Sequence, residues 1–111
     1  MLEKNKVNVG IIGAAGYWGP NVVRNVYKSD RYNRVVLCDS NFDKLNKLYS
    51  KSGFQLCENY LNILTDKDID CAIVCTPINT HFETAADLLY GNKHVLVQKP
   101  AVATTKEAQI L

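Results

Sequence analysis

The stretch VNVGIIGAAGYWGP, residues 7–20, decides the fold of this chain. Its first half is an apolar, β-branched run that predicts a strand, and a helix is predicted over residues 17–29. Between the two lie Gly13, Gly16 and Gly19, spaced one residue wider at the first step than in the common G-x-G-x-x-G turn. Such a turn brings the backbone close to a pyrophosphate, whose charge is met by the helix N-terminus. The alternative is an ordinary tight turn, but the position between a first strand and a first helix predicts dinucleotide binding.

Four further strands are predicted, and they alternate with helices. The strands are expected at residues 34–38, 54–57, 71–76 and 94–98. The helices are expected from the cap residue Asn41 to Gly53, over 59–64, from Thr80 to Leu89 and from Thr104 onward, the last two opened by T-x-x-E capping boxes. Because the strands are apolar on both faces, helices must cover both sides of a parallel sheet. Right-handed crossovers then predict an α/β fold, a doubly wound Rossmann-like sheet with strand order 3-2-1-4-5.

Length and composition fit a single globular domain over residues 1–111. With 47% apolar and 22% charged residues, the chain is neither disordered nor a coiled coil. Its net charge of +2 is too small to indicate nucleic-acid binding, and its apolar runs are too short to span a membrane. The first residues contain no apolar signal segment, so we expect a cytoplasmic protein with neither nucleic acid nor membrane as a partner.

The four cysteines, at positions 38, 57, 71 and 75, fit neither a disulfide framework nor a metal site. No C-x-x-C pair is present, and Cys38, Cys71 and Cys75 lie in the most apolar runs, where cysteine acts as a small hydrophobe. Cys71 and Cys75 would lie about 13 Å apart on one strand, which is too far for a disulfide. We therefore predict buried, reduced thiols and no metal site.

Asp39 follows the second predicted strand, twenty residues after Gly19. A carboxylate at this place hydrogen-bonds the adenosine ribose hydroxyls of NAD and repels the additional phosphate of NADP. Ser40 and Asn41 are small polar residues that tolerate a phosphate, but no arginine adjoins them. The sequence therefore favours NAD over NADP. The alternative for Asp39 is an ordinary aspartate at a strand end.

Two further polar segments follow the fourth and fifth predicted strands, where ligands bind in sheets of this kind. Thr76, Pro77 and His81 belong to the first segment, and Gln98 with Lys99 to the second. A lysine that points into a cofactor crevice donates or accepts a proton once burial lowers its pKa. The alternatives are a surface lysine and a histidine that only occupies the first turn of a helix.

The glycine turn, Asp39, T-P-x-x-x-H at 76–81 and K-P at 99–100 together resemble the N-terminal domain of the Gfo/Idh/MocA family, along essentially the whole chain. Its members are NAD(P)-dependent sugar and inositol oxidoreductases. In that family a Glu-Lys-Pro motif ends the fifth strand, with its lysine near the nicotinamide and the reacting hydroxyl. The resemblance implies that Lys99 is the catalytic residue and that Gln98 replaces the glutamate. The run GYWGPN at 16–21 is similar to members that oxidise nucleotide-linked amino sugars.

The predicted cofactor contacts are Gly13, Ala15, Gly16, Tyr17, Trp18, Gly19, Asp39, Ser40, Thr76, Pro77, His81, Gln98 and Lys99. The resemblance implies hydride transfer between a sugar-type hydroxyl and a nicotinamide, with a sugar or nucleotide sugar held by a second domain. These 111 residues leave no room for that domain, so we expect a truncated cofactor domain without turnover. A homo-oligomer is compatible with the intact enzyme. The rival interpretation is a non-catalytic dinucleotide-sensing module, which has no need for Lys99. A flavodoxin-like module without NAD is disfavoured by Asp39.

Overall fold

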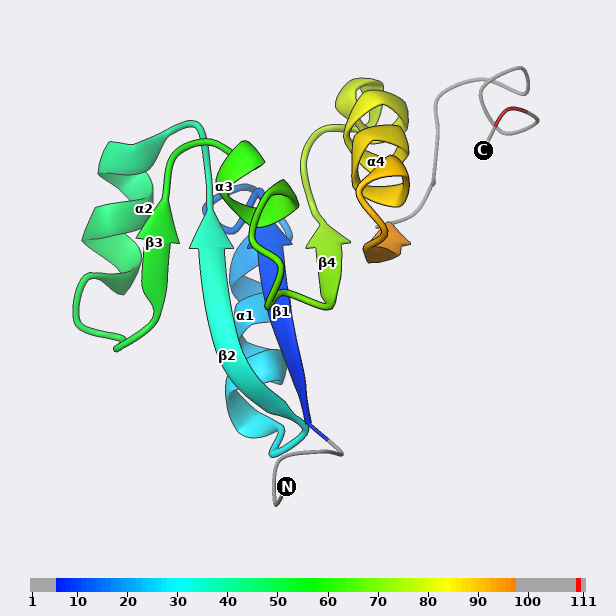
Figure 1. Ribbon diagram of the computed structural model, residues 1–111. Coiled ribbons are helices and arrows are strands. Elements are labelled where there is room, and N and C mark those ends of the chain that lie inside the picture. Colours follow the sequence, from blue (N-terminus) through cyan, green and yellow to red (C-terminus); the bar gives the residue numbers. More distant parts are fainter. Residues whose placement is uncertain (1–5, 98–109, 111) are drawn as a thin grey trace.

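Five parallel strands form one sheet in the computed structural model, which describes residues 6–97 and 110 (Figure 1). The strands are β1 (Val7–Ile12), β2 (Tyr32–Cys38), β3 (Gln55–Cys57), β4 (Cys71–Val74) and β5 (His94–Val97). Their order in the sheet is β3-β2-β1-β4-β5, and every neighbouring pair is parallel. The predicted Rossmann-like α/β fold and its strand order are confirmed.

Helices cover both faces of the sheet, as the apolar strands require. The helices are α1 (Gly19–Lys28), α2 (Phe42–Tyr49), α3 (Leu61–Leu64) and α4 (His81–Tyr90). On one face, α1 and α2 pack against a buried cluster that contains Ile11. On the other face, α3 and α4 pack against a cluster that contains Ile12. Successive residues of a strand point to opposite faces, so these two isoleucines lie in different cores.

The start of α4 differs from the prediction. Thr80 precedes the helix, but its side chain forms no capping hydrogen bond, so the predicted capping box at Thr80–Glu83 is wrong. The Thr80 hydroxyl instead lies 2.7 Å from both the Thr76 hydroxyl and the Pro77 carbonyl oxygen. A short 3₁₀ turn, Ile78–Thr80, leads into the helix there. The second predicted capping box, at residues 104–107, lies outside the described residues.

The cap of α2 follows the prediction. The Asn41 side chain accepts a hydrogen bond from the Lys44 backbone N–H at 3.2 Å, which satisfies one of the free donors of the first turn. In the described part of the chain, no helix has the length and apolar character needed to cross a membrane.

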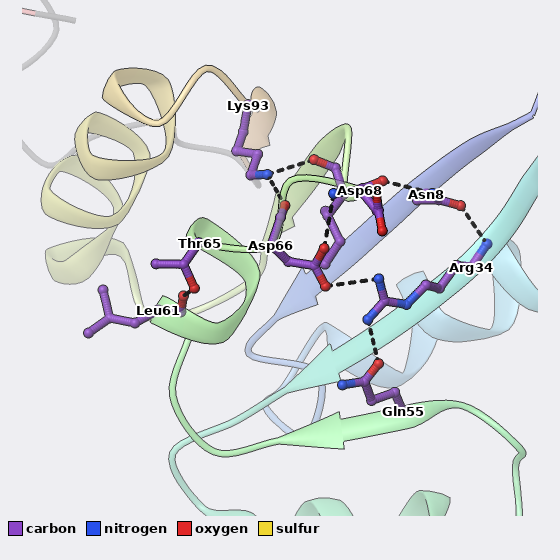
Figure 2. A network of polar contacts seen from close by, with 9 residues as sticks. Asn8, Arg34, Gln55, Leu61, Thr65, Asp66, Asp68 and Lys93 are labelled. Atoms are coloured by element: carbon purple, nitrogen blue, oxygen red, sulfur yellow. Dashed lines mark hydrogen bonds and ion pairs between the residues drawn. The ribbon is translucent and has the colours of Figure 1, made fainter.

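Polar side chains close the amino end of the sheet (Figure 2). Arg34 of β2 forms an ion pair with Asp66 at 2.8 Å and donates a hydrogen bond to the side-chain oxygen of Gln55 on β3 at 2.7 Å. The ammonium group of Lys93 is buried and donates to the carbonyl oxygens of Asp66 and Ile69, at 2.5 and 2.7 Å. The loop between α3 and β4 is therefore held from β2 on one side and from the start of β5 on the other.

Candidate functional site

A crevice of about 1200 Å³ opens at the carboxyl ends of the strands. Parallel strands all end at the same edge, so residues from distant parts of the sequence meet there. Most of the predicted contacts line it, namely Gly13, Ala15, Gly16, Tyr17, Trp18, Asp39, Ser40, Thr76, Pro77 and His81. Gly19 does not line the crevice, and Gln98 and Lys99 lie outside the described residues.

The glycine turn is anchored to β2 through backbone hydrogen bonds. Gly13 has a φ of +86°, a conformation that favours glycine, and a Cβ there would meet the carbonyl carbon of Cys75 at 2.8 Å. The N–H groups of Gly13 and Ala14 both donate to the carbonyl oxygen of Cys38, at 2.8 and 3.1 Å. The turn therefore sits directly over the ends of β1 and β2 and requires glycine at its first position.

Gly19 acts through packing rather than through contact with the crevice. A Cβ at this position would overlap the carbonyl group of Ala14 and would lie 2.5 Å from the carbonyl oxygen of Gly13. These are backbone atoms that cannot rotate away. The glycine therefore lets the start of α1 approach the turn closely.

Unpaired backbone donors lie where the turn meets α1. Within residues 6–97 and 110, the N–H groups of Tyr17, Trp18 and Gly19 have no hydrogen-bond partner. Pro20 follows in the first turn of α1 and has no N–H to satisfy. Free N–H groups and the positive end of the helix dipole together attract an anion such as a pyrophosphate.

Asp39 holds the turn as well as facing the crevice. Its Oδ2 accepts a hydrogen bond from the Ala15 N–H, and its Oδ1 accepts one from the Asn41 N–H, both at 2.9 Å. One carboxylate thus joins the glycine turn to the loop that begins α2. From sequence, Asp39 is predicted as a ribose ligand, with an ordinary strand-end aspartate as the alternative. The bond to Ala15 was missed because that residue is 24 positions away.

Lys44 also lines the crevice, and the sequence analysis missed it. It lies on the first turn of α2, close in sequence to Ser40 and Asn41, which line the crevice too. The sequence signal was available, because residue 44 is one turn from the cap Asn41 and faces the same end of the sheet. Lys44 thus adds a basic residue to the part of the crevice that Asp39 and Ser40 line, where only an arginine was considered from sequence.

His81 is buried and is bonded to the backbone. The side chain is 2% exposed, and its Nε2 lies 2.6 Å from the carbonyl oxygen of Thr76. A carbonyl oxygen only accepts, so Nε2 carries the proton and donates it. The ring forms part of the crevice wall while fixing the turn that carries Thr76 and Pro77.

The segment after β3 supplies a further wall that the sequence did not indicate. Glu58, Asn59 and Tyr60 line the crevice there. The Tyr60 hydroxyl donates to Oδ2 of Asp87 on α4 at 2.5 Å, and this bond to a carboxylate, together with burial, raises the pKa of Tyr60 to about 12. The hydrogen bond ties α3 to α4 across the crevice wall.

The fold and the site define a Rossmann-type dinucleotide-binding domain. The model of a family described as "Oxidoreductase family, NAD-binding Rossmann fold" (GFO_IDH_MocA) matches residues 7–111, and the chain belongs to this family. The resemblance stated from the motifs is thereby confirmed.

Individual relatives are more distant. The chain is 27% identical over 105 residues to the rhizopine catabolism protein MocA of Rhizobium meliloti, covering 94% of this chain and 32% of the relative. It is 19% identical over 107 residues to inositol 2-dehydrogenase of Rubrobacter xylanophilus, covering 96% and 31%. The chain thus spans about a third of the length of these curated relatives.

A solved structure shows the same fold. The chain superposes on KijD10, a 3-ketoreductase from Actinomadura kijaniata in complex with NADP and TDP-benzene, with a TM-score of 0.84 at 24% identity. The alignment covers 96% of this chain and 33% of that one. The prediction that NADP is the less favoured cofactor is not upheld, because a protein of this fold binds NADP. The domain is accordingly an NAD(P)-binding Rossmann domain of an oxidoreductase.

Proposed function

We propose that this chain is the cofactor-binding part of an oxidoreductase that transfers hydride between a sugar-type hydroxyl and NAD or NADP. The observation that carries the proposal is the junction of the glycine turn with α1. There a crevice of about 1200 Å³ meets unpaired N–H groups of Tyr17 and Trp18. The pyrophosphate of a dinucleotide fits these N–H donors, and the crevice offers space for the nucleoside at each end.

The residues present fit a dinucleotide along the whole crevice. A Cβ at Gly13 or Gly19 would collide with backbone, so the turn that would hold the pyrophosphate depends on these glycines. Asp39 and Ser40 would hold the adenosine ribose, and Thr76 with Pro77 would border the nicotinamide half. When bound, the cofactor supplies the hydride acceptor or donor, and the protein supplies binding and orientation.

The proposal covers both cofactors because two charged groups, one after β2 and one on α2, have opposite effects on the affinity for NADP. The carboxylate of Asp39 repels a 2′-phosphate, whereas the ammonium group of Lys44 attracts one. Both Asp39 oxygens already accept backbone hydrogen bonds, which disperses part of the negative charge. We therefore expect NAD and NADP to bind with affinities that differ by less than about tenfold, or about 1.4 kcal/mol.

Calorimetric titration of the chain with each cofactor tests this directly. Lys44→Met should weaken NADP by about 1 kcal/mol while NAD changes little, because only NADP has the added phosphate. Lys47→Met is the matched control, since Lys47 is exposed on the same helix and does not line the crevice. Binding of neither cofactor would reject the proposed function, and equal losses for both cofactors in Lys44→Met would reject the role of Lys44.

The substrate class rests on the relatives. Inositol 2-dehydrogenase acts on a polyol, as its name states, and KijD10 is a 3-ketoreductase solved with a TDP compound. We propose a sugar or nucleotide sugar, held by parts of a longer protein, because the chain spans about a third of its relatives. By itself the chain would then bind cofactor without turnover. Steady reduction of NAD by the chain with a panel of sugars would contradict this.

Lys99 is the proposed proton donor or acceptor, with Gln98 beside it. Both lie outside the described residues, so the support is the K-P motif that follows β5 at the crevice end of the sheet. In the full-length enzyme, Lys99→Met should lower kcat by about 10²- to 10⁴-fold with little change in NAD(P) affinity. A variant that keeps kcat within about threefold of the parent would reject the role.

A further inference from the structure

Two of the four cysteines lie side by side at the carboxyl edge of the sheet. Cys38 ends β2, Cys57 ends β3, and the two are direct partners in the parallel ladder. Both side chains belong to the buried cluster on the same face of the sheet. Neighbouring strands lie ~4.8 Å apart, and a disulfide needs Cα atoms ~4.4–6.8 Å apart. The ladder therefore places the Cα atoms of these two residues within the range that a disulfide spans.

The other two cysteines are not placed to compete. β1 separates β2 from β4, and Cys75 follows β4, so Cys38 and Cys75 are two strand spacings apart, ~10 Å. Cys75 also packs in the cluster on the opposite face. Cys71 begins β4 and so lies at the amino end of the strands, away from the crevice. All four cysteines are free thiols in this structure, and Cys38 with Cys57 is the single pair that the fold brings together.

The pair lies directly beneath the proposed ribose end of the crevice. Cys38 is among the residues that line the crevice, and its carbonyl oxygen anchors the glycine turn through Gly13 and Ala14. The Cys57 carbonyl accepts a hydrogen bond from the Asp39 N–H at 3.2 Å. A ligand that fills the crevice therefore lies against Cys38, the residue through which the buried pair meets the crevice.

The two thiols are also chemically unequal. Hydrogen bonds from Cys38 and then from Asn62 lower the pKa of Cys57, against the opposing effect of burial. The hydrogen bond to Cys57, followed by burial, raises the pKa of Cys38. Between the two thiols, ionisation is therefore favoured at Cys57 over Cys38. The thiolate is the reactive form of cysteine.

We propose that Cys38 and Cys57 are a peroxide-sensitive thiol pair that closes to a reversible disulfide when the crevice is empty and is shielded when a dinucleotide fills it. One thiol of the pair, as its thiolate, attacks one oxygen of hydrogen peroxide, the O–O bond breaks, and hydroxide leaves. The sulfur of the other thiol then attacks the oxidised sulfur, the S–S bond forms, and the S–O bond breaks as its oxygen departs with the proton of the second thiol as water. A solvent proton converts the released hydroxide to water. In total the two cysteines lose two electrons and hydrogen peroxide is reduced to two waters.

The test is a disulfide map of the chain after treatment with an equimolar amount of hydrogen peroxide, without cofactor. The expected product has lost the mass of two hydrogen atoms, contains a peptide that links Cys38 to Cys57, and reverts with dithiothreitol. Cys71 and Cys75 should remain open to alkylation after unfolding. Sulfinic acid at Cys57 without a linked peptide, or a link to another cysteine, would overturn the proposal.

Single variants sharpen the assignment. Cys38→Ala and Cys57→Ala should each abolish the loss of two hydrogens. Cys75→Ala is the matched control, because Cys75 is also buried and lines the crevice, and it should oxidise as the parent does. Loss of the disulfide in Cys75→Ala would contradict the pairing. The map of the unaltered chain does not depend on whether the variants fold.

Protection of the thiol pair by a bound cofactor rests on the proposed function. The experiment distinguishes failure of cofactor binding from failure of the thiol-pair proposal. With NAD or NADP at about 100 times its Kd, only ~1% of chains are empty, so disulfide formation should slow by up to ~100-fold. If calorimetry shows no binding while the disulfide still forms, the proposed function fails and the thiol pair stands. If the cofactor binds and the oxidation rate is unchanged, shielding is wrong.

Discussion

At the carboxyl end of the sheet, backbone groups and the Asp39 carboxylate fix loops that border an open crevice, whereas at the amino end charged side chains connect the loops to the strands. The carboxyl end keeps a crevice of about 1200 Å³. The amino end has hollows of only about 330 and 420 Å³, beside Lys93 and Arg34. The same five strands therefore carry a ligand site at one end and a closed polar network at the other.

The difference follows from the parallel topology. Every strand delivers its carboxyl end to one edge, and helices start from that edge with free N–H groups pointing toward the ligand. The chain must return to the opposite edge after each helix. There the loops expose carbonyl groups, such as those of Asp66 and Ile69, and Lys93 satisfies them. We expect substitutions at the two ends to separate binding from stability.

Gly19→Ala should have the largest effect and should act on both properties. The added methyl group overlaps backbone atoms of Ala14 and Gly13, so the turn must shift, at a cost of about 3 kcal/mol in unfolding free energy. Dinucleotide affinity should fall more than 100-fold, because the free N–H groups move with the turn. Urea unfolding and calorimetry measure the two effects.

Gly53→Ala is the control for Gly19→Ala. Gly53 also has a φ of +86°, but a Cβ there meets nothing within 4 Å. The cost should be about 1–2 kcal/mol from backbone strain, with unchanged cofactor affinity. Equal effects of the two substitutions would mean that close packing at Gly19 is not what shapes the turn.

Lys93→Met should destabilise the protein without weakening cofactor binding. The substitution removes the buried ammonium group that donates to the carbonyl oxygens of Asp66 and Ile69. Each acceptor left without a donor costs about 1–3 kcal/mol. The expected loss is about 2 kcal/mol in urea unfolding, the lower bound for two acceptors. Lys67→Met, at an exposed lysine of the same loop, should change stability by less than about 0.5 kcal/mol. A cofactor affinity that falls with Lys93→Met would break the separation of the two ends.

The two histidines, one at each end, provide a direct comparison. His81→Phe keeps a ring but loses the hydrogen bond to the Thr76 carbonyl, so stability should fall by about 1–2 kcal/mol and cofactor affinity several-fold. His94→Phe, at the exposed start of β5, should alter neither by more than about 0.5 kcal/mol. Thermal unfolding and calorimetry of both variants decide whether His81 positions the turn after β4.

Asp66→Asn should give the smallest effect, visible as a change in pH dependence. The backbone N–H of Asp68 and the Arg34 guanidinium lower the pKa of Asp66. The folded state therefore gains stability above the unfolded pKa of ~3.9, and this gain is lost as the pH falls through the lower folded value. Because the side chain is 24% exposed, the gain is below ~1 kcal/mol.

The control for this pH dependence is Asp30→Asn, an exposed carboxylate, which should leave the acid limb of the stability profile as it is. Unfolding free energies measured between pH 3 and pH 7 make the comparison. If Asp66→Asn also leaves that limb unchanged, the ion pair with Arg34 contributes nothing to stability.

The cysteines show where reasoning from sequence fails. Spacing along the chain argues against a Cys71–Cys75 disulfide, because the distance between residues of one strand follows from the strand rise. It offered no comparison of Cys38 with Cys57, since these residues meet only through the pairing of β2 with β3. Tyr60 and Asp87, 27 residues apart, were missed for the same reason.

The sequence by itself determined the strand order, the helices that lie between the strands, the glycine turn and the position of Asp39 after β2. Each depends on periodicity, on spacing or on residue types that a turn requires, which are local properties. Only the tertiary structure decided that Asp39 also holds Ala15 and that His81 is buried against Thr76. These contacts depend on which strand ends and helix starts are neighbours at the carboxyl edge. A local sequence pattern does not specify the distances between residues that are far apart in the chain.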